Sequence, residues 1–446
     1  MSSARELAEA TPATRNRYVD LLRFLSIALV VIGHWLLAVL GFRDGEFVGE
    51  NLLELAPDLQ IATWIFQVMP IFFLVGGYTN AISWASATRR GESYGDWLRA
   101  RCTRLLRPAL WFVGFWTVLP MLAVAIALPS SMARVGGQEV ALPLWFLSIY
   151  LLVVAVAPGL WALHRRDGPA LVVALALGTI FTDVVYYGLD QAWISVANYA
   201  FVWLAVLELG FLWRDGRLTA RPWMPWAFLG AGFATLIVLV TSFDYPVSMI
   251  TLSKADRSNA FPPSLALLAL GVAQTGAVLL FEGVANRWLE RPRVWLAVAV
   301  SNSMIMTFYL WNMSAVVLAA VLVFPTGIAP QPEPLSTAWW LLRPAWLLLC
   351  GICLLPFLFA FRWTERPVAS ASGRVGAAAG IAGAVAAAAG LAVLAREAFP
   401  VQGEVVLWPA VGVGLVVLGA LVLRVDPIAP LRGVLSVKPR SSVAGE

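Results

Sequence analysis

Long apolar segments separated by short polar connections follow one another along nearly the whole chain. Most of them reach the length of about 20 residues that a helix needs to cross the hydrocarbon core of a bilayer. We therefore predict an all-α fold, a polytopic transmembrane helix bundle of about twelve helices. The predicted helices lie near 21–41, 61–86, 105–128, 141–163, 170–188, 194–213, 225–243, 263–281, 295–323, 338–361, 375–395 and 404–423.

The composition supports a membrane protein and excludes a soluble one. Hydrophobic residues make up 60% of the chain and charged residues only 13%, which is more apolar surface than one soluble core can bury. The isoelectric point near 9.3 does not indicate nucleic-acid binding, because the basic residues form short clusters between apolar segments. Residues 1–16 are polar and no small-residue cleavage site follows the first apolar segment, so we predict a retained helix rather than a signal peptide.

The distribution of charge predicts the orientation of the helices. Alternate connections hold most of the 31 basic residues, whereas the connection 42–60 on the opposite side is mainly acidic. The positive-inside rule then places both termini in the cytoplasm. With the preference for Arg over Lys, which suggests a GC-rich bacterial genome, this pattern predicts a multi-pass protein of the bacterial cytoplasmic (inner or plasma) membrane.

The first predicted helix contains the most informative pair of ionisable residues, Arg23 and His34. Their separation is close to three helical turns, so both side chains lie on one face, roughly 16 Å apart along the axis. Asp20 is placed to form an intrahelical ion pair with Arg23. Ionisable groups within a membrane are costly and mark functional sites. The alternative is that Arg23 anchors the helix at the membrane surface, while His34, about two-thirds of the way across, hydrogen-bonds inside the bundle.

A group of arginines opens the third predicted helix. Arg101, Arg104 and Arg107 recur at a spacing of three and give one side of a helix several forked donors suited to phosphate groups. The alternative is a topology determinant that faces anionic lipid headgroups.

The second predicted helix contains the segment Met69–Asn80, with Pro70, Gly76 and Gly77. We expect Pro70 to kink the helix, and the two glycines to let another backbone approach. Such features are also ordinary in packed membrane bundles.

Other polar residues within the apolar segments are expected to form hydrogen bonds between helices. They are Gln67, Asp183, Glu208, Gln274, Asn302, Tyr309 and Asn312. Asp183 is expected near the outer surface, where it can act on an external substrate. Asn302, Tyr309 and Asn312 are expected on roughly one helix face.

The remaining candidate residues favour simpler roles. His164 lies in a predicted connection beside Arg165 and Arg166, where we expect a solvated side chain. Cys350 and Cys353 are expected to pack between helices rather than to carry out redox chemistry. No zinc-ligand cluster, P-loop, dinucleotide fingerprint or Gly-x-Ser-x-Gly elbow occurs in a credible context, so the sequence predicts no metal site and no nucleotide cofactor.

At these residues the chain resembles the acyltransferase 3 family of integral membrane acyltransferases. The motifs that carry the resemblance are the spacing of Arg23 and His34 with Asp20 upstream, then Phe72-Phe73-x-x-x-Gly77, then Arg101-x-x-Arg104 before Pro108. Trp145-Phe-Leu-Ser148 and Ser303-x-x-x-x-x-Tyr309-Leu-Trp311 resemble further features of the family. Two positions depart from it, because the family often has Ser at Gly76 and His at Asn312.

The resemblance implies a ten-helix acyltransferase core over residues 17–365. We expect a cytoplasmic N-terminal tail at 1–16, two additional transmembrane helices at 366–424 and a cytoplasmic C-terminal tail at 425–446. The two additional helices are rich in Ala, Gly and Val, and we expect them to face lipid rather than to line a site.

The resemblance also implies an enzyme that transfers acyl groups other than aminoacyl groups. It takes an acyl group, commonly acetyl, from cytoplasmic acyl-CoA, a co-substrate rather than a tightly bound cofactor, and passes it to a hydroxyl of a sugar, glycan or other metabolite. His34 is the implied catalytic residue, as general base or transient acyl carrier, assisted by Arg23 and Asp20. The implied phosphate ligands are Arg101, Arg104 and Arg107, and the implied site lining is Phe73, Gly77, Tyr78, Trp145, Tyr309 and Asn312.

Two other classes of protein stay open at this point. A twelve-helix secondary transporter or lipid flippase has the same layout, but we see no repeat between the two halves of the chain. A non-catalytic membrane scaffold leaves the register of Arg23 and His34 unexplained.

Overall fold

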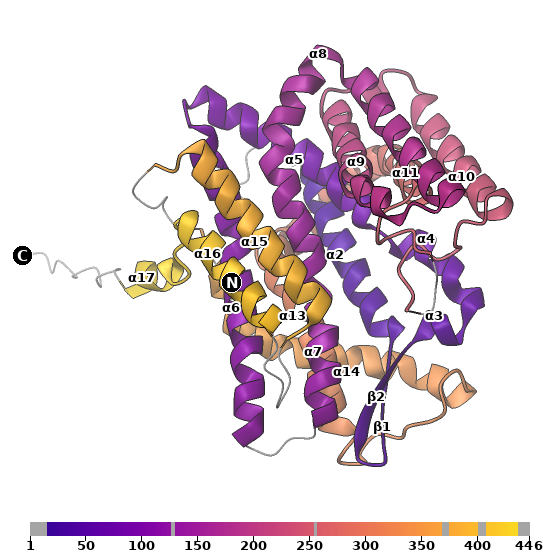
Figure 1. The fold of residues 1–446 in the computed structure, drawn as a ribbon, viewed down its shortest axis with the longest axis vertical. Helices are drawn as coiled ribbons and strands as arrows, with labels where there is room; N and C mark the ends of the chain where they lie inside the picture. The colour runs from indigo at the N-terminus through magenta and orange to yellow at the C-terminus, as the bar shows by residue number, and fades with distance from the viewer. Residues whose placement is uncertain (1–15, 126–129, 254–256, 368–373, 400–406, 436–446) are drawn as a thin grey trace, which may run out of the picture. The chain divides into compact units, whose positions relative to one another are not determined.

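The computed structural model describes residues 16–125, 130–253, 257–367, 374–399 and 407–435. The predicted N-terminal tail up to residue 15 and the predicted C-terminal tail from residue 436 lie outside these residues. Within the described residues, nine helical segments are long and apolar enough to cross a membrane. The predicted all-α transmembrane bundle is confirmed, and the chain is a multi-pass membrane protein (Figure 1).

One compact unit comprises the chain up to Glu92 together with Leu152–Ile305 and Leu318–Cys350. Its longer helices are α2 (Arg17–Leu37), α5 (Met69–Arg89), α9 (Asn198–Arg214), α10 (Met224–Ser242), α11 (Leu265–Leu289) and α12 (Pro292–Asn302). Its short elements are α3 (Leu52–Leu55), η1 (Pro57–Ala62), α4 (Thr63–Phe66), η2 (Ala192–Ala197) and η3 (Arg217–Thr219). Helix α5 packs on α9, α10 packs on α11, and α2 contacts α5, α11 and α12.

The second unit comprises Ser93–Leu151, Met306–Val317 and the chain from Gly351 onward. It contains α6 (Tyr94–Ala125), α7 (Ser130–Ala141), η4 (Arg362–Glu365), α15 (Ala377–Glu397), α16 (Leu407–Val422) and α17 (Ala429–Leu435). Three helices contribute residues to both units, namely α8 (Leu144–Leu189), α13 (Ile305–Val323) and α14 (Thr337–Phe361).

Small residues allow close helix packing in the first unit. A Cβ atom at Gly77 of α5 would collide with the carbonyl oxygen of Leu207 on α9, and one at Gly210 of α9 would collide with the carbonyl oxygen of Leu74 on α5. In a bilayer, where helix association depends on packing rather than on the hydrophobic effect, such contacts hold helices together. The predicted close approach at Gly77 is confirmed.

Helices α15 and α16 pack in the same way in the second unit. Gly383 faces the backbone of Gly419, and Gly390 faces the backbone of Gly412. Helix α15 also contacts α6 and α7, and the Ser148 hydroxyl donates a 2.7 Å hydrogen bond to the carbonyl oxygen of Ala388. The prediction that α15 is a lipid-facing addition is therefore wrong for the face that carries its glycines, because that face is buried.

The first membrane helix ends earlier than predicted and runs directly into a β-hairpin. Helix α2 ends at Leu37, and β1 (Ala38–Arg43) pairs antiparallel with β2 (Glu46–Asn51). Asp44 and Gly45 form the connection with φ angles of 53° and 84°, the left-handed region that tight hairpin turns require. The apolar pattern alone had extended the first helix through 41 and left 42–60 as a loop.

The second predicted helix is irregular, as expected, but the break comes before Pro70 rather than at it. The chain leaves the helical conformation at Gln67 and Val68, and Pro70 lies in the first turn of α5, where its missing N–H costs nothing. The Gln67 side chain donates to the carbonyl oxygen of Met249 at 2.8 Å, and the backbone carbonyl oxygen of Gln67 accepts a 2.9 Å bond from the Gln274 side chain. These bonds satisfy polar groups that the break exposes.

Two further breaks divide predicted spans. In α8 the backbone at Asp167 is non-helical, and its carboxylate accepts a hydrogen bond from the Ala170 N–H, so this residue caps the second half. The span predicted at 295–323 divides into α12 and α13. Asn302 therefore lies on a different helix from Tyr309 and Asn312, and the predicted common face is wrong.

Acidic side chains cap two other helices. Glu365 accepts bonds from the Met306 and Thr307 N–H groups at the start of α13, at 3.1 and 2.7 Å. Asp183 of α8 is buried and accepts a 2.7 Å bond from the Leu265 N–H at the start of α11. Its other donors are the Asn198 amide and the Tyr245 hydroxyl, at 2.6 and 2.9 Å. The geometry gives Asp183 the interhelical role, not action on an external substrate.

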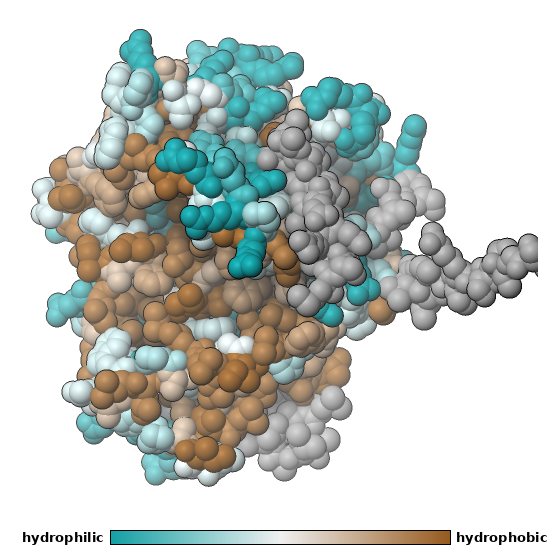
Figure 2. Space-filling model, turned by 180° about the vertical axis from the view of Figure 1, so that it is seen from behind, coloured by the Kyte–Doolittle hydropathy of each residue, from teal (hydrophilic) through white to brown (hydrophobic). Residues whose placement is uncertain are grey.

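Exposed hydrophobic side chains mark helix faces suited to lipid. On α8 they form a stripe at helical spacing, from Val173 through Leu177 and Phe181 to Val184, each about 60% exposed. Figure 2 shows hydrophobic side chains over much of the face in view. Cys102, Cys350 and Cys353 are buried and form no disulfide bond, which agrees with the packing role predicted for the last two.

We expect Gly77→Ala to destabilise the protein, because its methyl group forces α5 and α9 apart. The cost of overpacking is about 1–3 kcal/mol. The thermal unfolding midpoint in detergent micelles measures it. Gly230→Ala is the matched control, because nothing lies within 4 Å of a Cβ atom at Gly230 of α10. An equal midpoint for the two variants would contradict the packing argument.

Candidate functional site

Arg23 and His34 both lie on α2, as predicted, and both are half-buried. The helical rise separates them by roughly 16 Å along the axis. His34 is in the last turn, where its carbonyl oxygen accepts a bond from the Ala38 N–H. The imidazole therefore lies at the end of the helix next to the hairpin, rather than two-thirds of the way across as predicted.

Asp20 does not form the predicted ion pair with Arg23. Asp20 is 4% exposed, and its carbonyl oxygen accepts a 2.8 Å bond from the Asn302 side chain on α12. Within the described part of the chain, the Arg23 guanidinium makes no hydrogen bond or ion pair. Asp20 lies in the first turn of α2, where the helix dipole favours a carboxylate.

The end of α2 is held by the first half of α14. The Trp346 indole donates a 3.3 Å hydrogen bond to the carbonyl oxygen of Trp35, the residue after His34. Trp339 lies about two helical turns before Trp346 on α14, and it packs with Val39 of the hairpin and Leu52 of α3. The Phe42 N–H of the hairpin also donates a 2.7 Å bond to the Gln331 side chain. Figure 1 shows the hairpin beside this part of α14.

The predicted site residues of α5 pack inside the bundle. Phe73 is fully buried and stacks on Trp203 of α9, with ring centroids 4.3 Å apart. Gly77 lies in the contact between α5 and α9. Tyr78 is half-buried, and its hydroxyl accepts a 3.3 Å bond from the Asn16 amide. These three residues fix the position of α5.

The three arginines of α6 differ in their surroundings. Arg107 is 8% exposed and donates to the carbonyl oxygens of Asp426 and Arg366, at 3.2 and 3.3 Å. These bonds connect α6 to the segment that precedes α15 in the sequence and to the segment that follows α16. Arg101 is half-buried and Arg104 is exposed, so these two guanidinium groups are the more accessible.

The last three predicted residues belong to the second unit. The buried Tyr309 donates its hydroxyl proton to the carbonyl oxygen of Pro143 at 2.8 Å. The Asn312 amide, also buried, donates to the carbonyl oxygen of Tyr309 at 2.5 Å. Trp145, in the first turn of α8, is half-buried. Tyr309 and Asn312 thus donate to backbone carbonyl oxygens inside the protein.

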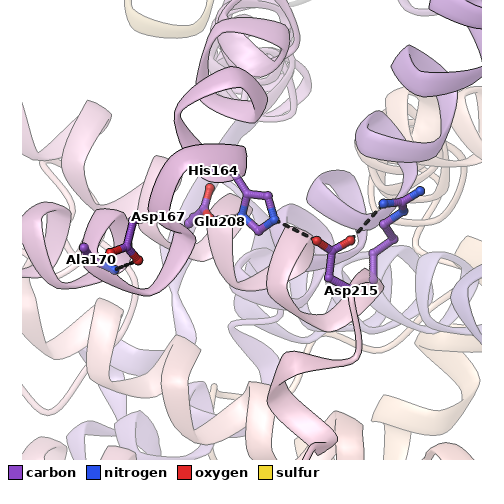
Figure 3. Close-up of polar contacts among 6 residues, drawn as sticks. His164, Asp167, Ala170, Glu208 and Asp215 are labelled. Carbon is purple, nitrogen blue, oxygen red and sulfur yellow. Dashed lines mark hydrogen bonds and ion pairs between the residues drawn. The ribbon is translucent and has the colours of Figure 1, made fainter.

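His164 is the clearest departure from expectation. It is 1% exposed, although we predicted a solvated side chain. Its Nδ1 atom hydrogen-bonds with Glu208 of α9, and its Nε2 atom lies 3.1 Å from the carboxylate of Asp215 (Figure 3). Each of these two hydrogen bonds needs a proton between nitrogen and oxygen, because a nitrogen lone pair and a carboxylate oxygen repel each other. Either both ring nitrogens carry a proton, or one nitrogen carries it and the carboxyl group opposite the other nitrogen is protonated.

Aromatic rings enclose this histidine. The Trp161 ring stacks on the imidazole at 4.8 Å between centroids, and the Phe211 ring meets it edge-on at 5.5 Å. A Cβ atom at Gly168 would collide with the imidazole, so only glycine fits beside it. The partners of His164 are 44 and 51 residues away in the sequence, which is why its neighbours Arg165 and Arg166 gave a misleading indication.

Asp215 links this buried group to the surface. Burial opposes its ionisation, but hydrogen bonds from His164 and Arg214 outweigh burial and hold the pKa of Asp215 below its ordinary value. Its ionised form therefore stabilises the fold above the ordinary pKa, and this contribution is lost as the pH falls through the lowered one. An open cavity of about 610 Å³ adjoins it, lined by Ala162, His164, Arg165, Arg166, Asp215 and Arg217.

Among the residues that the structure describes, no three His, Cys, Asp or Glu side chains come together as a group able to hold a metal ion.

Comparison with known families identifies the chain. Residues 16–363 match a family described as an acyltransferase domain, acyltransferase 3, which is more than half of the protein. The chain belongs to the acyltransferase 3 family. A search of curated proteins and a search of solved structures each gave no match.

Membership makes this protein a membrane acyltransferase. It implies an acyl donor and an acceptor, and it favours catalysis over the transporter and scaffold alternatives. The predicted site residues of the acyltransferase divide between its two units: Asp20, Arg23, His34, Phe73, Gly77 and Tyr78 belong to the first, and Arg101, Arg104, Arg107, Trp145, Tyr309 and Asn312 to the second.

We expect His164→Ala to destabilise the acyltransferase strongly. Removing the imidazole leaves Glu208 buried without its partner, and breaking a buried ion pair costs about 3–5 kcal/mol. The thermal midpoint in micelles measures the loss. Arg166→Ala is the control, because Arg166 is exposed. A small effect of His164→Ala, comparable with that of the control, would show that the imidazole is solvated after all.

Proposed function

We propose that this acyltransferase moves an acyl group, expected to be acetyl, from cytoplasmic acyl-CoA to a hydroxyl group of a carbohydrate, glycan or secondary metabolite. The observation that supports it best is the arrangement of α2. Arg23 and His34 lie on one helix, and both are half-buried rather than sealed in the core. Among the described residues, His164 is buried against two carboxylates and two aromatic rings, whereas His34 is half-buried, and we therefore assign the reaction with the substrate to His34.

The length of α2 suits an acyl carrier. Coenzyme A bears its phosphates at one end and its thioester at the end of a pantetheine arm. The reach of that arm is comparable with the roughly 16 Å between Arg23 and His34. With α2 running outward from the cytoplasm, the arm passes Arg23 and brings the thioester toward His34.

His34 acts on the acceptor by one of two balanced routes. As a general base, the imidazole takes the proton of the acceptor hydroxyl while its oxygen attacks the thioester carbonyl. The carbon–sulfur bond breaks, and the proton passes to the leaving thiolate. As a nucleophile, the imidazole takes the acyl group first, releases coenzyme A, and then transfers the group to the hydroxyl oxygen. Both routes give an ester and the free thiol, and both require a neutral imidazole at the start.

We assign the phosphate groups of acyl-CoA to Arg101 and Arg104, and we assign Arg107 a positioning role. Guanidinium groups match phosphate oxygens with paired donors. Arg101 and Arg104 are accessible enough for this, whereas Arg107 already donates to two carbonyl oxygens. In this proposal the catalytic core covers residues 17–365, the helices at 366–424 support α6, and both termini are cytoplasmic.

We expect His34→Ala to abolish acyl transfer while the protein stays folded. The assay follows release of free coenzyme A from acetyl-CoA by purified protein. Ile32→Ala is the matched control, because Ile32 is an exposed residue two positions away on α2. Radiolabelled acetyl-CoA separates the two routes, because only the nucleophilic route leaves label on the wild-type protein. Wild-type turnover by His34→Ala would exclude both routes.

We expect Arg101→Ala combined with Arg104→Ala to raise KM for acyl-CoA about tenfold or more, with little change in the acceptor KM. Losing a charge-assisted hydrogen bond costs about 1.5–3 kcal/mol. Arg107→Ala should instead lower the thermal midpoint, because two carbonyl oxygens lose their donor. If only the acceptor kinetics of the double variant change, the phosphate assignment is wrong.

A further inference from the structure

A buried arginine lies on the same end of the first unit as His34. Arg343 of α14 is 9% exposed, and its guanidinium carbon lies 3.5 Å from the centre of the Trp339 ring. Within the described residues, Arg343 donates no hydrogen bond and forms no ion pair. A guanidinium carries five N–H donors, so its hydrogen-bonding capacity is unused.

The position of Arg343 is fixed by the contacts of its helix. Trp339, Arg343 and Trp346 follow at spacings of four and three, so they share one face of α14. Trp339 packs against Val39 and the partly buried Leu37, and Trp346 bonds to the carbonyl oxygen of Trp35. Arg343 therefore faces the last turn of α2, which carries His34, and the first residues of the hairpin.

No carboxylate of the described residues forms an ion pair with Arg343. The segment from the hairpin to α4 carries Asp44, Glu46, Glu50, Glu54 and Asp58, and none of them pairs with it within the described residues. Glu54, for example, accepts two bonds from Ser253, both at 2.6 Å. Burying a charge without a partner is costly, and it becomes favourable when a ligand supplies the opposite charge. The guanidinium nitrogens are also not among the fully sealed polar atoms, so a ligand can reach them.

We propose that Arg343 binds an anionic oxygen group, a carboxylate or a phosphate, on the acceptor whose hydroxyl is acylated. The acceptor is then an acidic sugar or a sugar phosphate rather than a neutral one. A guanidinium group binds both groups through paired hydrogen bonds. The contact with the Trp339 ring restricts the orientation of the Arg343 guanidinium group. Binding there would set the acceptor next to the end of α2. The proposal rests on the proposed function for the identity of the bound molecule, but not for the anion site itself.

The test measures binding first, without acyl-CoA. Purified full-length protein in uncharged micelles is heated with glucuronate, glucose 6-phosphate or neutral methyl glucoside at equal ionic strength. We expect at least one anionic sugar to raise the unfolding midpoint saturably, because ligands of the folded state stabilise it, and methyl glucoside to leave it unchanged. Arg343→Met should raise the half-saturating concentration about tenfold or more. Leu341→Ala, at a 75% exposed position on α14, is the control.

Several outcomes overturn the proposal. They are the absence of a saturable shift with either anionic sugar, an equal shift in Arg343→Met, or a shift produced only by phosphatidylglycerol added to the micelles. The last result would assign Arg343 to lipid headgroups. If Arg343→Met does not fold, Arg343→Lys decides, because it keeps the charge but loses the fork and should bind several-fold more weakly.

A second measurement separates this proposal from the proposed function. His34→Ala should keep the full shift with the anionic sugar while it loses acyl transfer. In the wild type, acylation of the stabilising sugar supports the acceptor assignment, and Arg343→Lys should raise the acceptor KM more than it lowers kcat. If the shift depends on Arg343 but acetyl-CoA is never consumed, the proposed function fails and the anion site stands. If the protein acylates only neutral acceptors, the acceptor assignment fails.

Discussion

The structure depends on one constraint: inside a bilayer, each peptide N–H and C=O must find a partner within the protein. An unbroken helix meets this demand alone, but this chain interrupts its helices at Gln67, at Asp167 and between Asn302 and Ile305. Side chains satisfy the groups that these breaks expose. Gln67 and Gln274 act at the first, Asp167 at the second and Glu365 at the third, while Asp183 caps α11. Most intramembrane polar residues are therefore explained by backbone chemistry.

The same reasoning separates the two histidines. His164 is surrounded on all sides: carboxylates engage both ring nitrogens, and aromatic rings cover its faces. His34 ends a helix, is half-buried, and lies where α2, the hairpin and α14 meet. A residue type that is rare in the chain thus serves stability at position 164 and, in the proposed function, chemistry at position 34. The two histidines differ in burial, because His164 is 1% exposed whereas His34 is half-buried.

Apolar segment length predicted nearly all of the helices, because the requirement that it reports is set by the thickness of the bilayer. The register of Arg23 and His34 also followed from sequence, since helical spacing is fixed within one element. Features that depend on distant residues did not follow. The network of His164 joins residues 44 and 51 positions apart, and the partners of Arg107 lie 259 and 319 positions away. Glu208 within an apolar segment and the nearby Asp215 were the only available indications of that network.

The hairpin was missed for a different reason. Residues 38–42 are apolar and read as a continuation of α2, and only the pair Asp44 and Gly45 indicates a turn. Its presence has a mechanical consequence, because no flexible linker separates β1 from the turn that holds His34. The strand pair is held by the contact of Val39 with Trp339 and by the hydrogen bond from the Phe42 N–H to Gln331. The contacts that hold the hairpin therefore also fix the direction in which the last turn of α2 ends.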